Sequence, residues 1–347
     1  MQQIEIDLYS DTKTRPTQPM REAIAAAEVG DEQCQEDPSV ERLLVRTGSL
    51  LEHEAAVFLP SGTMANQIAV LVHCRPGDEL IAHESSHLIL SEGGAPAALA
   101  GVMIRSLQGP RGLFTREAVR EAVRAGTRHN PTSRLVVVEQ TANVGGGAVW
   151  PLDHMKQVVE EARTHNLSVH LDGARLMNAS VASGLPAGTY SRMFDSVYMD
   201  FTKGLGAPFG AILTGSREFI KKAWRWKQRL GGSMRQAGMM AAACLYALDH
   251  HVERLWEDHE NARRLADLLT GIAGIAVEPV DTNIVFFDVA RLGISAETFN
   301  DALKLRGTRA GIFGPTRLRF VTHLDVSKEQ IQRAAKIVAE VATGLKS

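Results

Sequence analysis

The sequence has few cysteines, few aromatic residues and almost no excess of charge of either sign. Its three cysteines, Cys34, Cys74 and Cys244, are far apart, which excludes a disulfide framework or a cysteine metal site and suits a reducing cytoplasm. Aromatic residues make up 5 % of the 347 residues and the formal charge is -2, so nothing indicates a surface for nucleic acid or an anionic membrane. No apolar run approaches about eighteen residues, and the first residues lack the features of a signal peptide. We therefore expect a soluble, cytoplasmic protein that binds neither nucleic acid nor membrane.

Apolar runs alternate with amphipathic stretches, which is the pattern of a mostly parallel sheet covered by helices. This α/β pattern predicts seven strands in a large domain, at residues 55–59, 79–82, 102–105, 135–139, 168–172, 195–199 and 211–214. Helices are expected at 63–74, 116–125, 152–166 and 218–229, and one long helical region at 236–269. A smaller α/β domain should follow, with strands at 275–279, 283–288 and 318–322 and helices at 296–306 and 328–343. The expected division is an N-terminal arm at 1–20, a large domain at 21–250 and a small domain at 251–347.

Two charged residues stand where strands are expected to end. Asp172 ends an apolar run, and Lys203, thirty-one residues later, opens the glycine-rich segment Lys-Gly-Leu-Gly-Ala-Pro. A lysine amine can hold the aldehyde of pyridoxal 5'-phosphate (PLP) as a Schiff base, and a carboxylate can keep its pyridine nitrogen protonated. Either residue alone would be read as an ordinary surface charge. Together they indicate a cofactor site.

Two further features fit anions. Gly62 and Thr63 follow a strand and open a helix, so backbone N–H groups and the helix dipole could bind a phosphate there, although a helix cap without a ligand has the same pattern. Arg319 lies in an apolar strand, where an unpaired guanidinium is costly. It should pair with a carboxylate of a substrate or, alternatively, of an internal salt bridge. The same two alternatives hold for Arg175, and His87, in a loop after a strand, is either structural or functional.

Eight segments, in order along nearly the whole chain, look like the threonine aldolase family. They are 10–16 (SDTKTRP), 30–32 (GDE) with 36–38 (EDP), 60–66 (PSGTMAN), 170–175 (HLDGAR), 203–208 (KGLGAP), 234–238 (MRQAG) and 318–323 (LRFVTH). The resemblance implies a PLP-dependent enzyme of fold type I, the fold of aspartate aminotransferase.

The resemblance also implies roles for individual residues, carried over position by position. Lys203 would link PLP, Asp172 would contact its ring nitrogen and His87 would stack on the ring. The phosphate would be bound by Gly62, Thr63 and, across a subunit interface, Arg235. The substrate carboxylate would be bound by Arg319 and Arg175 with help from Ser10, and Arg175 would also contact the phenolic oxygen of PLP. A homodimer or homotetramer with active sites at the subunit interface follows from the role of Arg235.

The implied reaction is retro-aldol cleavage of an L-β-hydroxy-α-amino acid to glycine and an aldehyde. Other PLP enzymes share the scaffold, so an aminotransferase, a decarboxylase or a β-eliminating lyase is an alternative, as is a binding protein without catalysis.

One departure from the family concerns the substrate. Ala142 stands where the family usually has a histidine near the substrate hydroxyl. Its small side chain predicts a roomier pocket, suited to the phenyl group of phenylserine rather than to the methyl group of threonine, with threonine or allo-threonine as alternative substrates. It also leaves His87, acting through a water, as the candidate base. The alternative is neutral drift, with another group or a water performing the proton transfer.

The segment His83-Glu-Ser-Ser-His87 matches the zinc motif His-Glu-x-x-His. That motif binds zinc on a helix, where residues four apart share one face. Here it follows an expected strand and contains two serines, so we expect a loop and no metal.

Overall fold

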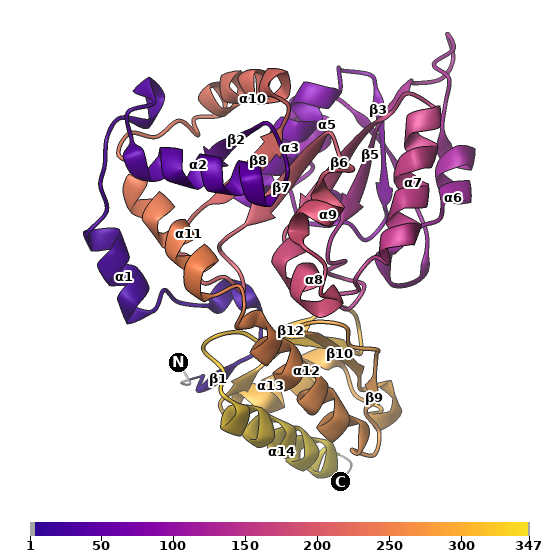
Figure 1. Cartoon of the computed structure of the whole chain (residues 1–347). Coiled ribbons are helices and arrows are strands. Elements are labelled where there is room, and N and C mark those ends of the chain that lie inside the picture. The colour runs from indigo at the N-terminus through magenta and orange to yellow at the C-terminus, as the bar shows by residue number, and fades with distance from the viewer. Residues whose placement is uncertain (1–3, 346–347) are drawn as a thin grey trace.

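The computed structural model describes residues 4–345 and consists of a large α/β unit joined to a smaller one (Figure 1). The seven expected strands form one sheet, in the order β2-β8-β7-β6-β5-β3-β4. Their bounds are β2 (Ala55–Leu59), β8 (Ala211–Gly215), β7 (Ser196–Asp200), β6 (Ser168–Gly173), β5 (Ser133–Glu139), β3 (Glu79–His83) and β4 (Met103–Leu107). Only β8 runs against its neighbours, so the mostly parallel sheet predicted from the sequence is confirmed.

Helices cover both faces of this sheet, which explains why its central strands are apolar throughout. On one face, side chains of alternate strand residues such as Val57 and Leu213 pack under α3 (Gly62–His73), α5 (Ala95–Ala100) and α10 (Arg217–Arg229). The intervening residues, such as Phe58 and Ile212, belong to the core of the opposite face. That face is covered by α2 (Pro38–Leu50), α6 (Arg116–Ala122), α7 (Leu152–Thr164), α8 (Leu176–Ser183), α9 (Ala187–Ser191) and α11 (Gly238–His250).

The smaller unit has a four-stranded antiparallel sheet with its own core. The strand order is β12 (Gly311–Ile312), β13 (Arg317–Val321), β10 (Ile284–Asp288) and β9 (Ala276–Val277). Three helices pack on it, namely α12 (Leu255–Thr270), α13 (Ala296–Lys304) and α14 (Lys328–Gly344).

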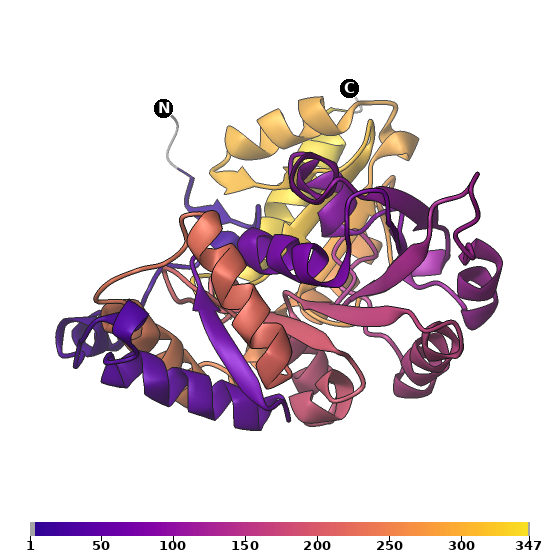
Figure 2. The same ribbon diagram turned by 90° about the horizontal axis from the view of Figure 1, so that it is seen from above.

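The N-terminal segment packs against this smaller unit. Strand β1 (Ile6–Asp7) pairs in parallel with β11 (Thr308–Arg309), and the Ile6 side chain lies in the small core. The two described ends of the chain therefore lie at the small unit (Figures 1 and 2). We propose the division into arm, large domain and small domain on these separate cores; residues 1–3 and 346–347 lie outside the described part.

The region expected to be helical at 236–269 is helical, but as two helices with a break between them and not as one continuous helix. Helix α11 ends at His250 and α12 begins at Leu255. Between them, the His251 ring lies 2.7 Å from the Leu205 carbonyl oxygen, which holds the bend. Helix α11 packs on α1 (Gln18–Ala25) and α2, whereas α12 packs in the small core. Without proline in this stretch, the sequence carried no signal for the break.

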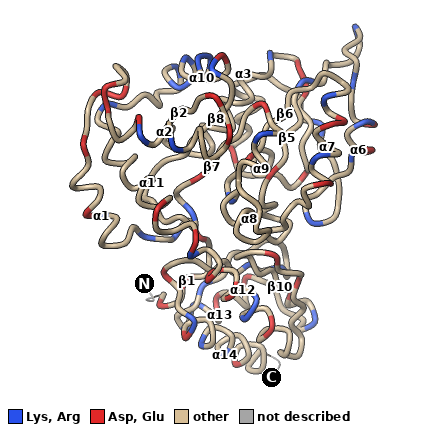
Figure 3. Tube along the Cα trace, in the orientation of Figure 1, with Lys and Arg blue, Asp and Glu red and all other residues tan. Residues whose placement is uncertain are grey.

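The remaining elements are short: α4 (His87–Leu90), and the 3₁₀ turns η1 (Asp11–Lys13), η2 (Glu32–Cys34), η3 (Pro110–Gly112) and η4 (Ala290–Leu292). Acidic and basic residues are interspersed along the trace (Figure 3). Within residues 4–345, no helix is long and apolar enough to cross a membrane.

Candidate active site

The carboxyl ends of three parallel strands bring the predicted cofactor residues together. Asp172 of β6 lies beside Glu139 of β5 and Tyr198 of β7 in the sheet register. Lys203 follows the end of β7, and Arg175 follows the end of β6. Ligands of open α/β sheets bind at this edge, because the loops that leave parallel strands all emerge there.

Asp172 is buried and held by two donors. Its Oδ1 accepts a hydrogen bond from the Ala174 N–H (3.1 Å), and its Oδ2 accepts one from the Asn66 amide (2.8 Å). Burial raises the pKa of Asp172, whereas a positive charge nearby lowers it. A protonated ring nitrogen would be such a charge, so the carboxylate fits the role predicted for it.

Asn66 also connects Asp172 to His87 through a buried glutamate. The Asn66 amide donates to Glu92 Oε1 (2.8 Å), and the same oxygen lies 2.9 Å from His87 Nδ1. The hydrogen bond to Glu92 raises the pKa of His87 despite partial burial. Sequence reasoning missed Asn66 and Glu92: Asn66 lies in the recognised segment 60–66, whereas nothing local marks Glu92.

The predicted phosphate cup is the N-terminus of α3. The Ser61 hydroxyl caps this helix by accepting from the Met64 N–H (3.2 Å), and Thr63 is exposed. A side chain at Gly62 would overlap the Tyr198 hydroxyl, so only glycine fits here. The backbone at Gly62 thus packs directly against Tyr198 of β7, and the N-terminus of α3 lies where a phosphate could bind.

Arg235 does not contact the other predicted residues. Its side chain is 63 % exposed, and its guanidinium lies 2.8 Å from Asp31. Its expected role in the phosphate site of another subunit stays a proposal.

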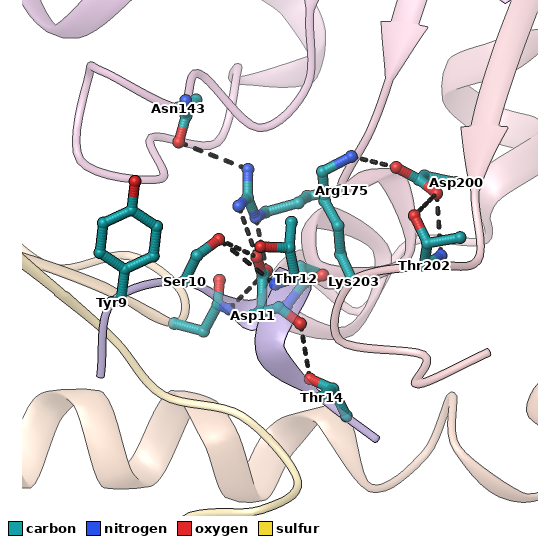
Figure 4. Close-up of polar contacts among 12 residues, drawn as sticks. Tyr9, Ser10, Asp11, Thr12, Thr14, Asn143, Arg175, Asp200, Thr202 and Lys203 are labelled. Carbon is teal, nitrogen blue, oxygen red and sulfur yellow. Dashed lines mark hydrogen bonds and ion pairs between the residues drawn. The ribbon is translucent and has the colours of Figure 1, made fainter. Parts of the chain in front are cut away.

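Arg175 is largely committed to a buried ion pair (Figure 4). Its Nε and Nη2 each donate to a carboxylate oxygen of Asp11 at 2.7 Å, and only Nη1 faces Asn143 Oδ1, at 3.5 Å. Burial would raise the pKa of Asp11, but the charge and hydrogen bonds of Arg175 hold it far below its usual value. The structure thus shows an internal salt bridge for Arg175; three of its five N–H groups are used, and its contact with a ligand stays a prediction.

Ser10 supports this ion pair rather than facing Arg319. Its hydroxyl donates to Asp11 Oδ1 (3.4 Å) and accepts from the Thr12 N–H (3.2 Å), which caps the turn η1. The predicted contact of Ser10 with a substrate carboxylate stays a prediction.

Arg319 is a buried cation without an acidic partner in the described part of the chain. It is 6 % exposed, and within residues 4–345 no carboxylate pairs with it. Its Nη1 donates to Asn143 Oδ1 (2.7 Å), its Nη2 donates to the Tyr9 carbonyl oxygen (3.3 Å), and its Nε has no partner. Burial lowers the pKa of Arg319 to about 10. A buried guanidinium with an unused donor is a site for an anion.

Ala142 is packed rather than open. It is 3 % exposed, its N–H donates to the Ala148 carbonyl oxygen (3.0 Å), and two glycines lie directly against its methyl group. A Cβ added at Gly112 or Gly145 would lie 2.8 Å or 3.1 Å from the Ala142 Cβ. The volume that a larger residue would occupy is thus filled by these two loops, and no contact of Ala142 with an open pocket is seen.

The zinc hypothesis has no structural support. His83 ends β3, whereas His87 begins α4, so the two rings do not share a helix face. The His83 ring is engaged by Ser85 Oγ (2.7 Å) and the Gly109 carbonyl oxygen (3.1 Å). In the described part of the chain, His87, Glu92 and Asp172 form the one group with metal-ligand proximity, and Asn66 already links both of its carboxylates.

The donor set fits PLP: an amine in Lys203, a buried carboxylate in Asp172 and a glycine at the start of α3; the Nε–H of Arg319 is left for a further anion. This fit rests on the chemical groups of the residues and not on the volume of a cavity. A hollow of about 700 Å³ between α2 and α10 contains none of these residues. The cleft lined by Arg175, Asp200 and Lys203 measures about 10 Å³.

Comparisons with known proteins agree with this reading. Residues 7–292 match the model of the beta-eliminating lyase family. The chain is 40 % identical over 331 residues to the low specificity L-threonine aldolase of Escherichia coli (strain K12), covering 95 % of this chain and 97 % of that protein. It is 38 % identical over 335 residues to low-specificity L-threonine aldolase 1 of Arabidopsis thaliana, covering 94 % and 93 %.

A solved structure of Leishmania major threonine aldolase shares the fold. Its TM-score is 0.85 at 20 % identity, covering 97 % of this chain and 99 % of that one. The family match, the two sequence relatives and this shared fold together identify the family of the chain. It belongs to the threonine aldolase family of PLP-dependent carbon–carbon lyases with fold type I.

Proposed function

We propose that this enzyme cleaves the Cα–Cβ bond of L-β-hydroxy-α-amino acids of the threonine type, giving glycine and an aldehyde. The observation that carries the proposal is Arg319, a buried cation with an unused Nε–H beside the Lys203 and Asp172 site. An amino-acid carboxylate would supply the missing anion. The names of the two sequence relatives, both low-specificity L-threonine aldolases, support the substrate class.

PLP, held by Lys203, Asp172 and Gly62, would supply an electron sink for the bond broken at the α-carbon. Arg319 binds the carboxylate through its fork of N–H groups, and Asn143 holds that fork at 2.7 Å. Fixing the carboxylate determines which bond at the α-carbon is aligned for cleavage, which removes part of the entropic barrier. The Nη1 group of Arg175 lies on the same side, facing the same Asn143 oxygen.

The proton of the substrate hydroxyl needs an acceptor. We retain His87, acting through a water, because its side chain is 36 % exposed and Glu92 orients its ring. Glu139 is a second candidate, since burial and then the charge of Asp172 raise its pKa to about 7. Both Glu139 oxygens, however, accept backbone hydrogen bonds, from His87 (2.6 Å) and Asn143 (2.7 Å). Glu139 therefore serves first to hold His87 and Asn143 in place.

Acceptance of a bulkier β-group, such as the phenyl group of phenylserine, is the finer part of the proposal. It is supported by the missing imidazole at Ala142, which also removes a polar group, and not by free volume, because Gly112 and Gly145 fill that space. The ratio of kcat/KM for L-phenylserine to that for L-threonine tests this point. A clear preference for threonine would overturn the proposed acceptance of a bulky β-group and leave the reaction type untouched.

The reaction type is tested by the products. Purified enzyme with PLP should release one aldehyde and one glycine per substrate, without a keto-acid acceptor. Formation of ammonia and a keto acid would instead indicate a β-eliminating lyase, and dependence on a keto acid would indicate an aminotransferase. Lys203→Ala should lose both the reaction and the borohydride-trapped PLP adduct; an adduct retained at another residue would contradict the assignment of the lysine.

We also propose a homodimer or homotetramer in which Arg235 of one subunit reaches the phosphate of another. The exposure of this arginine, apart from the other site residues, supports the proposal. Mixing Arg235→Ala subunits with Lys203→Ala subunits tests it, because a hybrid would contain one site with both residues intact. Partial recovery of activity is expected, and no recovery in demonstrated hybrids would refute a shared site.

A further inference from the structure

A second buried carboxylate, Asp200, faces Lys203 and has no role in the reaction described above. Asp200 is the last residue of β7 and is 6 % exposed. Its Oδ2 forms an ion pair with the Lys203 amine, whose side chain is 17 % exposed. Figure 4 shows the lysine extended toward this carboxylate.

The orientation of the Asp200 carboxylate is fixed without the lysine. Its Oδ1 accepts hydrogen bonds from both the N–H and the hydroxyl of Thr202, each at 2.8 Å. Its Oδ2 accepts a hydrogen bond from the Tyr198 hydroxyl at 3.1 Å. The carboxylate is therefore preorganised by its own strand and turn, and Lys203 docks on a site that already exists.

Asp172, by contrast, is not a partner of the amine. Its two oxygens are taken by the Ala174 N–H and the Asn66 amide. Within residues 4–345, the polar contacts of the Lys203 amine are Asp200 and the Tyr198 hydroxyl, at 3.4 Å for the latter. One carboxylate thus serves the ring-nitrogen position and another serves the amine.

We propose that Asp200 is a positioning residue that holds the Lys203 amine as an ammonium ion whenever the amine is not covalently bound, and thereby sets the pH range in which Lys203 takes up the cofactor. This inference rests on the proposed role of Lys203 as the PLP anchor. The Tyr198 hydroxyl, which also lies against Gly62 at the start of α3, donates a hydrogen bond to the Asp200 carboxylate and thereby weakens its ion pair with the Lys203 amine.

The chemistry of uptake explains why the pair matters. An ammonium ion must lose one proton before the nitrogen lone pair can attack the aldehyde carbon. As the C–N double bond forms, two hydrogens of the original ammonium leave with the carbonyl oxygen as water, and the third stays on the nitrogen. The product is still cationic at nitrogen, so Asp200 faces a positive charge before and after the step. Removing the negative charge of Asp200 should therefore lower the pH at which the Lys203 ammonium ion, and the cationic nitrogen formed from it, lose a proton.

Other charged and titratable groups act on this pair from neighbouring elements. They are Asp11 on η1, Asp172 at the end of β6, Arg175 after β6, Tyr198 on β7 and Cys244 on α11. Burial and then the charge of Asp200 raise the pKa of Tyr198 far above its usual value, so this phenol stays protonated and donates a hydrogen bond to the carboxylate. Asp200 alone among these groups contacts the amine directly through a carboxylate.

The test measures covalent PLP uptake rather than turnover. Full-length protein freed of PLP is mixed with it at a series of pH values, and the absorbance of the linked cofactor is followed. Borohydride trapping and peptide mass spectrometry locate the link. Asp200→Asn should move the half-maximal pH of uptake down by about one unit or more, which is about a tenfold faster uptake below the midpoint. Tyr198→Phe should move it up, because the carboxylate then holds the ammonium ion more tightly.

Asp195→Asn is the matched control. Asp195 lies just before β7, pairs with Arg163 at 2.7 Å and should leave the profile unchanged. An unchanged profile in Asp200→Asn, with the wild-type link mapped to Lys203, overturns the inference and leaves the proposed function intact. Absence of any wild-type link at Lys203 overturns both. If circular dichroism shows that Asp200→Asn does not fold, Tyr198→Phe decides: a shift to higher pH supports the inference, and no shift or a shift to lower pH refutes it.

Discussion

Arg319 should matter far more for function than for stability, and Arg319→Met separates the two. The guanidinium is 6 % exposed and no carboxylate in residues 4–345 neutralises it. Burial lowers its pKa to about 10, and a fall of this size corresponds to an unfavourable free energy of about 3 kcal/mol for the charged form. Methionine is a shorter side chain that carries no charge, so it removes this penalty.

The expected change in stability is much smaller than this penalty. Methionine loses the hydrogen bonds from the charged guanidinium to Asn143 Oδ1 and the Tyr9 carbonyl oxygen, at about 1.5 kcal/mol each. These losses offset the penalty, so the net change should stay within about 1 kcal/mol, or about 1–2 °C in Tm for a chain of this length. Activity should change far more. Losing a buried, hydrogen-bonded partner of the substrate carboxylate costs about 3–4 kcal/mol, so kcat/KM should fall about 10²- to 10³-fold.

Two assays on the same preparations check this prediction. Thermal unfolding without ligand gives the stability, and aldehyde release gives kcat/KM. Arg333→Met is a charge-matched control on α14, where the arginine pairs with exposed Glu5 at 2.7 Å; its activity should stay within twofold of wild type. An Arg319→Met enzyme that is clearly less stable, or one that keeps its kcat/KM, would show that this arginine is structural and refute the reasoning.

Three further predictions follow from buried contacts. Asp11→Asn leaves Arg175 charged and without its ion-pair partner, so the free energy of unfolding should fall by about 3–5 kcal/mol in denaturant titrations. Because the pKa of Asp11 is lowered in the folded protein, wild type keeps the stabilisation by this ion pair above the ordinary carboxyl pKa and loses it only as pH falls toward the folded-state pKa. The difference in free energy of unfolding between variant and wild type should therefore shrink in acid. A difference that stays constant with pH would contradict the ion pair as its cause. Gly62→Ala places a methyl group on a tyrosine hydroxyl of β7 and should weaken PLP affinity at least tenfold in fluorescence titrations, whereas unchanged affinity would exclude this helix start as the phosphate cup. Glu92→Gln should lower the pKa of His87, seen as an NMR titration displaced to lower pH. Because the pKa of His87 is raised in the folded protein, its protonation stabilises the fold at low pH, and this stabilisation is lost as the pH rises through the folded-state pKa; the variant should therefore be less stable than wild type below about pH 6.5. Identical titration curves for variant and wild type would exclude Glu92 as the partner of His87.

The sequence by itself determined the sheet and the core of the cofactor chemistry. Runs such as those of β6 and β7 are apolar because both faces are covered, and this local pattern placed Asp172 and Lys203 at strand ends. Parallel strands end at one edge, so their proximity followed from pattern and chain direction alone. The helix start at Gly62 was equally local, because its signal is a strand, a glycine and a cap.

Pairings between distant loops were decided only by the tertiary structure. Whether Arg175 meets a substrate or Asp11, 164 residues away, depends on where η1 docks, and no local pattern encodes that. The same holds for Asn143, which reaches Arg319 across 176 residues, and for Ala142, whose free volume the glycine loops remove. The periodicity of a segment reflects which of its side chains are buried in the core, and this can be found from local sequence. The partner of a buried charge depends on the path of the whole chain and cannot.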